Sequence, residues 1–402
     1  MQLPLTGVRV VEFCSVAAGP YCAMLLADMG ADVIKVENPN GGDSMRAWPP
    51  LTEGFSENFA SVNRNKRAIT LDLKDATDNA RAKALIEGAD VVLENNRPGV
   101  MQRLGLDYAA MSRTNPKLVY CSISAFGQEG PRAREAGFDL TLQAMSGVMS
   151  VTGEEGGAPV KCGVPLSDFC TGLYAAYAIA AALMQARATG QGTHVDASMF
   201  GASLAVAALQ TSEYFGSGRD PRKLGSAHPR NAPYQAFQAR DGWFAMAAGN
   251  NALFKAACNA MDWPELADDP RFASTALRAQ HQAELKALLD ERVFSKLDAA
   301  DLLARFRAAG VPCSPINTYS EALADPQVEH MGWVSQIALP GGGSARTFGS
   351  PLRFSGQAFP ITRDPPALGQ HNAEVFAEID ALIAARTHDA EVDAPPKVAR
   401  HA

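Results

Sequence analysis

Residues 7–37, GVRVVEFCSVAAGPYCAMLLADMGADVIKVE, decide the fold class of this chain. Residues 7–13 form an apolar run of strand length, and residues 16–20 are typical of a tight turn. Residues 21–29 repeat apolar side chains at helical spacing and stop at Gly30, a residue that commonly ends helices. Residues 31–37 follow as a second strand. This order predicts the first unit of a parallel α/β sheet.

The same alternation continues along the first half of the chain. Further strands are predicted at residues 68–73, 89–94, 118–124 and 193–198, with a helix at residues 76–87. Loops rich in Gly, Asn and Arg follow several of these strands. Ligands of open α/β sheets bind beyond the carboxyl ends of the strands. We therefore predict a Rossmann-like parallel sheet with its site at that edge.

Residues 164–187, VPLSDFCTGLYAAYAIAAALMQAR, contain an apolar run of sixteen residues, from Phe169 to Met184, that carries no charge. A helix that is apolar all round must be buried on all sides. The run is short for a membrane span. We therefore expect the central helix of a soluble core, with Asp168 at its N-terminal end.

A change in composition at residues 216–233, which are polar and rich in Gly, Pro and basic side chains, indicates a linker. We predict a large α/β domain at residues 1–215 and a smaller α+β domain at residues 234–335. Residues 336–386 would return to the large domain, and residues 387–402 would form a mobile tail.

The composition is that of an ordinary globular protein, with 47 % hydrophobic and 20 % charged residues among 402. A net charge of −7 argues against nucleic-acid binding, which needs a basic face. The seven cysteines are scattered without metal-ligand spacing, and the N-terminus has no signal-peptide pattern. We expect a cytoplasmic protein with reduced thiols, no metal, and no membrane or nucleic-acid partner.

Asp168 has two interpretations on chemistry alone. Aspartate is among the best N-cap residues, because its carboxylate accepts the free amides of a first helical turn. A carboxylate that stays ionised at a helix N-terminus can instead act as a nucleophile toward acyl donors. Gly163, Pro165 and Gly172 would let a bulky ligand approach the backbone. The residues by themselves leave both roles open.

A set of ordered motifs extends over nearly the whole chain. They are GVRVVEF at 7–13, AGP at 18–20, GADVIKVE at 30–37, GD at 42–43, NRNKR at 63–67, DVVLEN at 90–95, RPG at 97–99, RLG at 103–105, FGQEGP at 126–131, SD at 167–168, TG at 171–172 and TGQG at 189–192. In this order the chain resembles the family III CoA-transferases, which include formyl-CoA and carnitine CoA-transferases.

The resemblance implies that Asp168 is the catalytic nucleophile. Asp168 would attack an acyl-CoA thioester, and the intermediate would be an aspartyl-CoA thioester from which an acceptor acid takes CoA. CoA and acyl-CoA would then be substrates, with no tightly bound cofactor. The resemblance also implies an interlocked homodimer.

The residues that match CoA contacts of the family lie at or after the ends of three of the predicted strands. They are Val16, Ala17, Ala18, Leu71, Asp72, Leu73, Lys74, Asn95, Asn96, Arg97 and Arg103. Without the resemblance, Arg97 and Arg103 would be taken for solvated surface charges. Formyl-specific members carry Gln at the position of Ala17, so formate chemistry is disfavoured.

Residues 225–251 most resemble members that use succinyl-CoA with glutarate-like acids. A distal carboxylate needs a cation or several donors. His228 and Arg46 are the predicted substrate contacts, with Arg64 and Arg230 as further candidates. His228 could equally be a turn residue before Pro229.

Two alternatives stay open beside CoA transfer from succinyl-CoA or a similar donor to a dicarboxylic acid. One is a 2-methylacyl-CoA racemase, which works with a His and an Asp as paired acid and base. The racemase His matches Phe138, which cannot transfer a proton. The other is a non-catalytic CoA-binding protein of the same fold.

Overall fold

The computed structural model describes residues 2–392, with side chains to residue 384, and the chain forms two compact units. The first unit contains residues 1–147, 162–212 and 329–402, and the second contains residues 148–161 and 213–328. The division predicted from sequence differs in three places. Residues 148–161 belong to the second unit. The longer segment of that unit begins at residue 213, before the polar stretch interpreted as a linker, and ends at residue 328 rather than 335.

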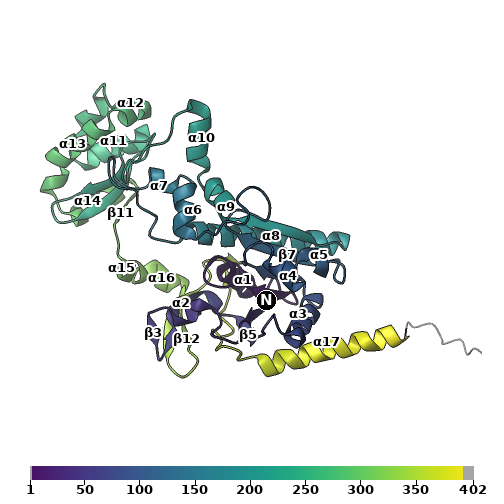
Figure 1. The fold of residues 1–402 in the computed structure, drawn as a ribbon. Coiled ribbons are helices and arrows are strands. Elements are labelled where there is room, and N and C mark those ends of the chain that lie inside the picture. The colour runs from purple at the N-terminus through teal and green to yellow at the C-terminus, as the bar shows by residue number, and fades with distance from the viewer. Residues whose placement is uncertain (1, 393–402) are drawn as a thin grey trace, which may run out of the picture. The chain divides into compact units, whose positions relative to one another are not determined.

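The first unit is built on a six-stranded parallel sheet (Figure 1). Its strands are β1 (Arg9–Phe13), β2 (Asp32–Glu37), β5 (Lys66–Thr70), β6 (Val91–Glu94), β7 (Val119–Ser124) and β8 (Thr193–Ser198). They lie in the order β5-β2-β1-β6-β7-β8. The chain therefore proceeds from β1 in one direction and later reverses to β6, so β1 and β6 form the switch point at which ligands of such sheets bind.

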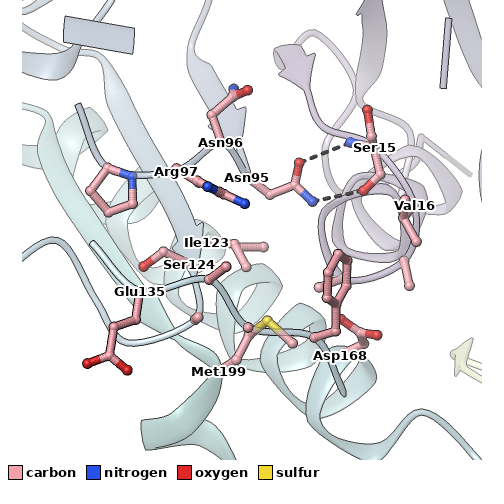
Figure 2. Close-up of a pocket in the computed structure, with 17 residues that line it drawn as sticks. Ser15, Val16, Asn95, Asn96, Arg97, Ile123, Ser124, Glu135, Asp168 and Met199 are labelled. Atoms are coloured by element: carbon pink, nitrogen blue, oxygen red, sulfur yellow. Dashed lines mark hydrogen bonds between the residues drawn. The ribbon is translucent and has the colours of Figure 1, made fainter. Parts of the chain in front are cut away.

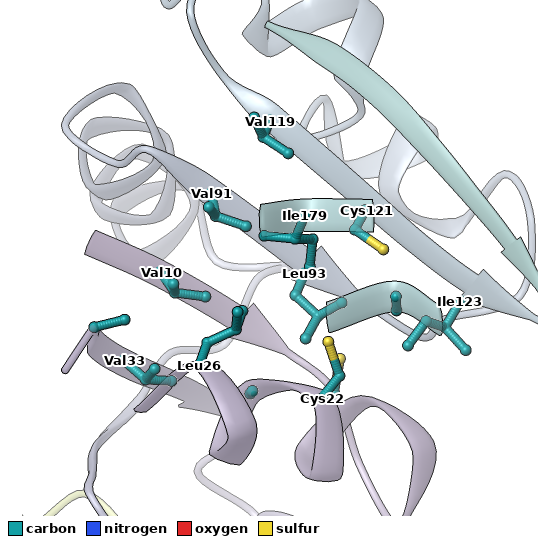
Figure 3. Close-up of a cluster of buried hydrophobic side chains, with 14 of the residues drawn as sticks. Val10, Cys22, Leu26, Val33, Val91, Leu93, Val119, Cys121, Ile123 and Ile179 are labelled. Carbon is teal, nitrogen blue, oxygen red and sulfur yellow. The ribbon is translucent and has the colours of Figure 1, made fainter. Parts of the chain in front are cut away.

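Helices cover both faces of this sheet. The helices α1 (Ala18–Asp28) and α8 (Leu166–Thr189) pack on one face, while α3 (Ala76–Glu87) and α17 (Asn372–Val392) pack on the other. Successive strand residues alternate between the two cores: Val10 lies in the cluster drawn in Figure 3, and Val11 lies in the cluster on the other face. This double burial explains why neighbouring positions are apolar in the central strands β1, β6 and β7.

Helix α8 differs from the prediction in its length and in its burial. It begins at Leu166 and is 24 residues long, and only one face is buried within this chain. Leu173, Tyr177 and Met184 are 51 %, 74 % and 74 % exposed. Helix α8 is long and apolar enough to cross a membrane, although 39 % of its most apolar window is buried in the protein. Complete burial was therefore a wrong prediction for the single chain.

The second unit has an α+β architecture, as predicted. The strands β9 (Tyr234–Gln238), β10 (Trp243–Ala247) and β11 (Cys313–Pro315) form an antiparallel sheet. The helices α11 (Asn251–Ala260), α13 (Gln282–Arg292) and α14 (Ala299–Ala308) pack against it. Phe237, Phe244, Phe294 and Phe306 meet at its centre with ring centroids 5.0–6.4 Å apart.

Shorter elements connect these layers. The helices are α2 (Glu57–Asn63), α4 (Val100–Leu104), α5 (Tyr108–Met111), α6 (Asp139–Met145), α7 (Val148–Val151), α9 (Met199–Val206), α10 (Ala208–Ser217), α12 (Thr275–Gln280), α15 (Tyr319–Leu323), α16 (Pro326–Met331) and 3-10 turns η1 (Ser44–Ala47), η2 (Pro264–Asp268) and η3 (Phe294–Lys296). The strands are β3 (Leu51–Thr52), β4 (Phe55–Ser56), β12 (Val334–Ala338), β13 (Ser344–Phe348), β14 (Arg353–Phe354) and β15 (Gln357–Ala358). Helix α17 overlaps the first part of the predicted tail, whose residues 393–402 lie outside the described part of the chain.

Candidate active site

The turns after β1 and β6 are joined at the switch point of the sheet. The backbone N–H of Ser15 donates to Oδ1 of Asn95 at 3.0 Å, and Nδ2 of Asn95 donates to the carbonyl oxygen of Ser15 at 2.8 Å (Figure 2). A single amide side chain thus satisfies both backbone groups of a residue in the other turn. The pair fixes the two turns relative to each other.

Asp168 lies in the first turn of α8, beside the start of α1. Its position is fixed by Gly172, one turn further along the same face of α8. A Cβ atom on Gly172 would lie 2.8 Å from the carbonyl oxygen of Ala18, so the two helices approach each other closely here. Asp168 therefore lies next to the turn that enters α1.

The interpretation of Asp168 as an N-cap is wrong. Pro165 is the N-cap residue of α8, and Asp168 is the third residue inside the helix. No side-chain hydrogen bond caps this helix. Among the side chains that the structure describes, none donates a hydrogen bond to the Asp168 carboxylate, and no backbone amide does so. The carboxylate is therefore open to a ligand.

Asp168 lines a cavity of about 290 Å³, here called the Asp168 cavity. The turns after β1 and β6 form part of its wall, and Phe138 and Met199 also line it. Figure 2 shows Asp168 and Val16 on the same side of this cavity. A second cavity of about 400 Å³, the Lys74 cavity, lies along the ends of β1, β2 and β5. Ser15 and Asn96 line both cavities, so the two are adjacent.

All eleven residues predicted to contact CoA line one of these cavities. Those in the Asp168 cavity are Val16, Ala17, Ala18, Asn95, Asn96 and Arg97. Those in the Lys74 cavity are Leu71, Asp72, Leu73, Lys74, Asn96 and Arg103. Residues separated by up to about ninety positions thus meet along one continuous edge of the sheet, the edge where parallel strands end. Lys74, Arg97 and Arg103 are exposed cations along it.

The electrostatic environment of Asp168 differs from the expectation that its carboxylate stays ionised. Burial, and secondly the charge of Asp139, raise the pKa of Asp168 to about 7. Asp139 begins α6 and is held by two donors. Its Oδ1 accepts the backbone N–H of Ser167 at 2.9 Å, and its Oδ2 accepts from Nε2 of Gln143 at 2.8 Å. Two carboxylates therefore meet at the first turn of α8.

Asp139 was missed as a site residue. It stands next to Phe138, a position considered only for the racemase alternative. Its influence on Asp168 arises because α6 brings together residues that lie 29 positions apart. A polar residue directly after Gly137-Phe138, in a chain segment of few regular elements, was the available signal.

Phe138 lines the Asp168 cavity with 74 % of its surface exposed. Its ring has no titratable group. Among the described residues of this cavity, Glu135 is the other titratable acid beside Asp168, and no histidine lines it. The His–Asp pair with which such a racemase works is therefore not assembled from the described residues of this cavity.

The structure gives Arg46 other partners than a substrate. Its Nε and Nη2 donate to the carboxylate of Glu37 at 2.9 and 2.6 Å, and Nη1 donates to the carbonyl oxygen of Pro366 at 3.0 Å. The guanidinium also lies 3.8 Å from the ring centroid of Phe59. Arg46 does not line either cavity among the described residues, so its donors are used within the fold.

His228 belongs to the second unit. Its Nδ1 accepts the backbone N–H groups of Arg230 and Asn231, each at 3.1 Å, and its ring packs on Tyr234. These bonds organise the turn before β9. Arg64 of the first unit is also committed, because it pairs with the buried Asp28 at 2.6 Å.

No cluster of three or more metal-ligating side chains occurs within the described part of the chain. The cavities therefore offer backbone groups, amides, three exposed cations and one carboxylate of raised pKa. Such a set suits a large anionic ligand that presents a reactive carbonyl group to Asp168.

Comparisons with known proteins show the family to which the chain belongs. A sequence model described as CoA-transferase family III matches residues 5–372. The chain is 42 % identical to the succinate–glutarate CoA-transferase of Agrobacterium fabrum, over 94 % of this chain and 96 % of that protein. It is 38 % identical to the human succinyl-CoA:glutarate CoA-transferase, over 94 % and 86 %.

A solved structure gives the same result for the fold. The crystal structure of a CAIB/BAIF family protein from Brucella suis is similar to this chain with a TM-score of 0.84 and 40 % sequence identity. The match covers 94 % of this chain and all of that one. With a family model that spans most of its length and relatives above 30 % identity, the chain belongs to CoA-transferase family III.

Proposed function

We propose that this enzyme transfers CoA from succinyl-CoA, or a similar acyl-CoA, to a dicarboxylic acid such as glutarate. The observation that carries the proposal is Asp168, a carboxylate without hydrogen-bond donors among the described residues, in a cavity that continues into the cation-lined Lys74 cavity. The names of the Agrobacterium and human relatives supply the acid pair.

The proposed chemistry runs through Asp168. Its ionised carboxylate attacks the thioester carbonyl carbon, the carbon–sulfur bond breaks, and CoA thiolate leaves behind a mixed anhydride. The thiolate then attacks the aspartyl carbon of that anhydride and releases the donor acid, which leaves an aspartyl-CoA thioester. The acceptor carboxylate reverses both steps. Proton release is not required, because carboxylate and thiolate exchange places at each step.

The surrounding residues support this chemistry in two ways. Helix α1 begins with three backbone N–H groups, those of Ala17, Ala18 and Gly19. Within residues 2–392 no acceptor is described for them. Such amides, at the positive end of a helix dipole, favour the negative charge that develops on an attacked carbonyl oxygen. Retained CoA also makes each return attack effectively unimolecular.

Lys74, Arg97 and Arg103 are the proposed partners of the CoA phosphates. They are exposed at the edge of the cavities rather than paired within the fold, and none takes part in an ion pair among the described residues. A cation held ready in this way binds phosphate without first breaking an internal bond.

We also propose that the enzyme is an interlocked homodimer in the cytoplasm. The exposed apolar face of α8, which includes Leu173, Tyr177 and Met184, supports self-association. The seven cysteines are all unpaired in the structure, which agrees with a reducing compartment. Sedimentation of the purified chain should give twice the monomer mass, and a monomer would refute this part.

The decisive experiment uses Asp168→Asn, which keeps the shape of the side chain. With succinyl-CoA and glutarate, this variant should lose transfer by a factor on the order of 10³ or more. Wild-type enzyme exposed to succinyl-CoA and then to hydroxylamine should carry a mass change on the peptide that contains Asp168. Substantial turnover by the variant, or a modified peptide elsewhere, would contradict the mechanism.

A separate proton-exchange assay distinguishes the racemase from the transferase. It would exchange the α-proton of a 2-methylacyl-CoA with deuterated water without any acceptor acid. Exchange by the wild-type enzyme in the absence of acid would favour the racemase, and its absence together with transfer to glutarate would favour the transferase.

A further inference from the structure

Four charged side chains are buried beneath the start of α1, on the sheet face that α1 covers. Glu12 of β1, Lys35 of β2 and Lys66 of β5 are 0 % exposed, and Asp43 is 1 % exposed. Nζ of Lys35 lies 3.2 Å from Oε1 of Glu12 and 3.1 Å from Oδ2 of Asp43. Nζ of Lys66 lies 2.9 Å from Oε2 of Glu12. The two positive and two negative charges form one connected cluster.

Buried ion pairs are weak evidence for stability, because desolvation offsets the attraction between the charges. A buried cluster of this kind can instead fix one conformation of the backbone groups that it contacts.

The cluster holds the chain at three points, two in the turn between β1 and α1 and one in the first turn of α1. Nζ of Lys35 donates to the carbonyl oxygen of Cys14 at 2.8 Å. The carboxylate of Asp43 accepts the N–H of Val16 at 3.0 and 3.1 Å from its two oxygens. Nζ of Lys66 donates to the carbonyl oxygen of Pro20 at 2.9 Å.

Val16, at the middle point, has an unusual backbone conformation. Its φ is +69°, in the left-handed region. This region disfavours side chains with a Cβ atom, and a β-branched residue there is a genuine outlier. Such conformations persist only where the surroundings impose them, and they gather at functional sites. Among the surroundings of Val16, the Asp43 carboxylate is the group that holds its N–H.

Asp43 is in turn fixed from several sides. It accepts the N–H of Met45 at 3.0 Å, and its own N–H donates to Oε2 of Glu37 at 2.9 Å. It therefore has little freedom to follow a movement of Val16. The constraint continues toward the site, because Ser15 is bonded twice to Asn95 and both turns line the Asp168 cavity.

We propose that Asp43 is a positioning residue for CoA transfer, which clamps Val16 in its left-handed conformation and so fixes the turns that line the Asp168 cavity. The role in CoA transfer rests on the proposed function, whereas the clamp is a property of the fold. Asp43 does not react with the substrate. It acts through Val16, Ser15 and Asn95.

A mutant cycle on the full-length chain tests the clamp. Asp43→Asn removes the charge and one of the two acceptors, so Val16 can relax to an extended φ. We expect kcat with succinyl-CoA and glutarate to fall by about tenfold or more, and KM to change less than kcat. In a Val16→Gly background the left-handed φ costs little, so the same Asp43→Asn change should lower kcat about fivefold less.

Val16→Ala is the matched control. It removes nearly the same side-chain contacts as Val16→Gly but keeps the Cβ atom that disfavours a positive φ. Asp43→Asn should therefore lower kcat as much in the Val16→Ala background as in wild type. Equal losses in wild type and in the Val16→Ala and Val16→Gly backgrounds would overturn the clamp, and so would a rescue of equal size by the two substitutions.

Thermal unfolding of the same variants gives a readout that does not depend on the substrate. Asp43→Asn should lower Tm less in the Val16→Gly background than in wild type or in the Val16→Ala background. If Asp43→Asn alone gives no folded protein, the clamp predicts that adding Val16→Gly restores folding, and failure to restore it overturns the clamp. If the wild-type enzyme transfers no CoA, the proposed function fails while this cycle still tests the clamp.

Discussion

Asp43 and Asp168 are two carboxylates of the same unit with opposite environments. Asp43 is almost completely buried, yet two backbone amides and the ammonium group of Lys35 surround it. Burial alone would raise its pKa, but the charge of Lys35 and the amides of Met45 and Val16 bring the pKa of Asp43 below its ordinary value. Asp168 has no such donors, and burial together with Asp139 raises its pKa to about 7.

The difference separates a carboxylate that holds structure from one that is left available for reaction. A carboxylate that accepts several hydrogen bonds is a poor nucleophile toward a thioester, because the attack would break those bonds. A carboxylate that is desolvated and placed near a second acid is destabilised as an anion, so formation of a neutral anhydride or thioester relieves that cost. Perturbed pKa values of this second kind are typical of functional sites.

The largest effect is expected when Asp43 is made to resemble Asp168. Lys35→Met leaves Asp43 and Glu12 buried without the cation between them. Removal of one partner from a buried ion pair commonly costs about 3–5 kcal/mol, so urea should unfold this variant at a much lower concentration. Lys74→Met is the matched control, because Lys74 is exposed and its loss should change stability by less than about 0.5 kcal/mol. Equal stability of the two variants would refute a structural role for the cluster.

A smaller effect of opposite sign is expected at Asp168. Its folded-state pKa of about 7 lies above the value of about 3.9 in an unfolded chain, so ionisation destabilises the fold. The cost begins near pH 4 and is complete above pH 7. Asp168→Asn should therefore be more stable than wild type at pH 8, by about 2–4 kcal/mol, since the difference between the two pKa values corresponds to about 4 kcal/mol at most. The gain should disappear at pH 4, and equal stability at both pH values would contradict the raised pKa.

Much of the parallel sheet and the position of the site could be predicted from the sequence. All six parallel strands were predicted to within a few residues, because short segments with apolar or alternating side chains are bounded by turn residues along the chain. The two cavities lie beyond the carboxyl ends of the strands, beside the loops rich in Gly, Asn and Arg that the sequence shows there. The nucleophile assignment of Asp168 depended on the ordered motifs and stays a proposal.

Three features could not be predicted, each for a physical reason. The exposed face of α8 was missed, because an apolar pattern does not say whether a side chain is covered by its own chain or by another molecule. The pKa of Asp168 depends on Asp139, which is distant in sequence. The left-handed conformation of Val16 contradicts the preference of a β-branched residue, so local propensity argues against it.

A change at Asp139 would sharpen the comparison through the pH dependence of activity. Only the ionised form of Asp168 attacks, so kcat/KM should rise with pH through about 7. Asp139→Asn removes the second cause of the raised pKa, and the rise should move to lower pH. The displacement should be smaller than the whole distance from 3.8 to about 7, because burial is the larger cause and remains. A profile that does not move, or moves to higher pH, would exclude an electrostatic role for Asp139.

The smallest effect is expected at Arg103, which lines the Lys74 cavity together with Asp43 but is exposed. Arg103→Ala should raise the KM for succinyl-CoA about threefold to tenfold and leave kcat nearly unchanged. The reason is that an exposed charge stabilises the bound substrate and the transition state equally. The increase should shrink at high salt, since salt screens the contact with phosphate. Asp43→Asn should show the reverse pattern, with kcat more affected than KM and little dependence on salt. Two residues of one cavity would then be distinguished by kinetics alone: Arg103 by holding the substrate and Asp43 by holding the enzyme. A fall in kcat for Arg103→Ala that matches its change in KM would mean that its charge also acts in the transition state.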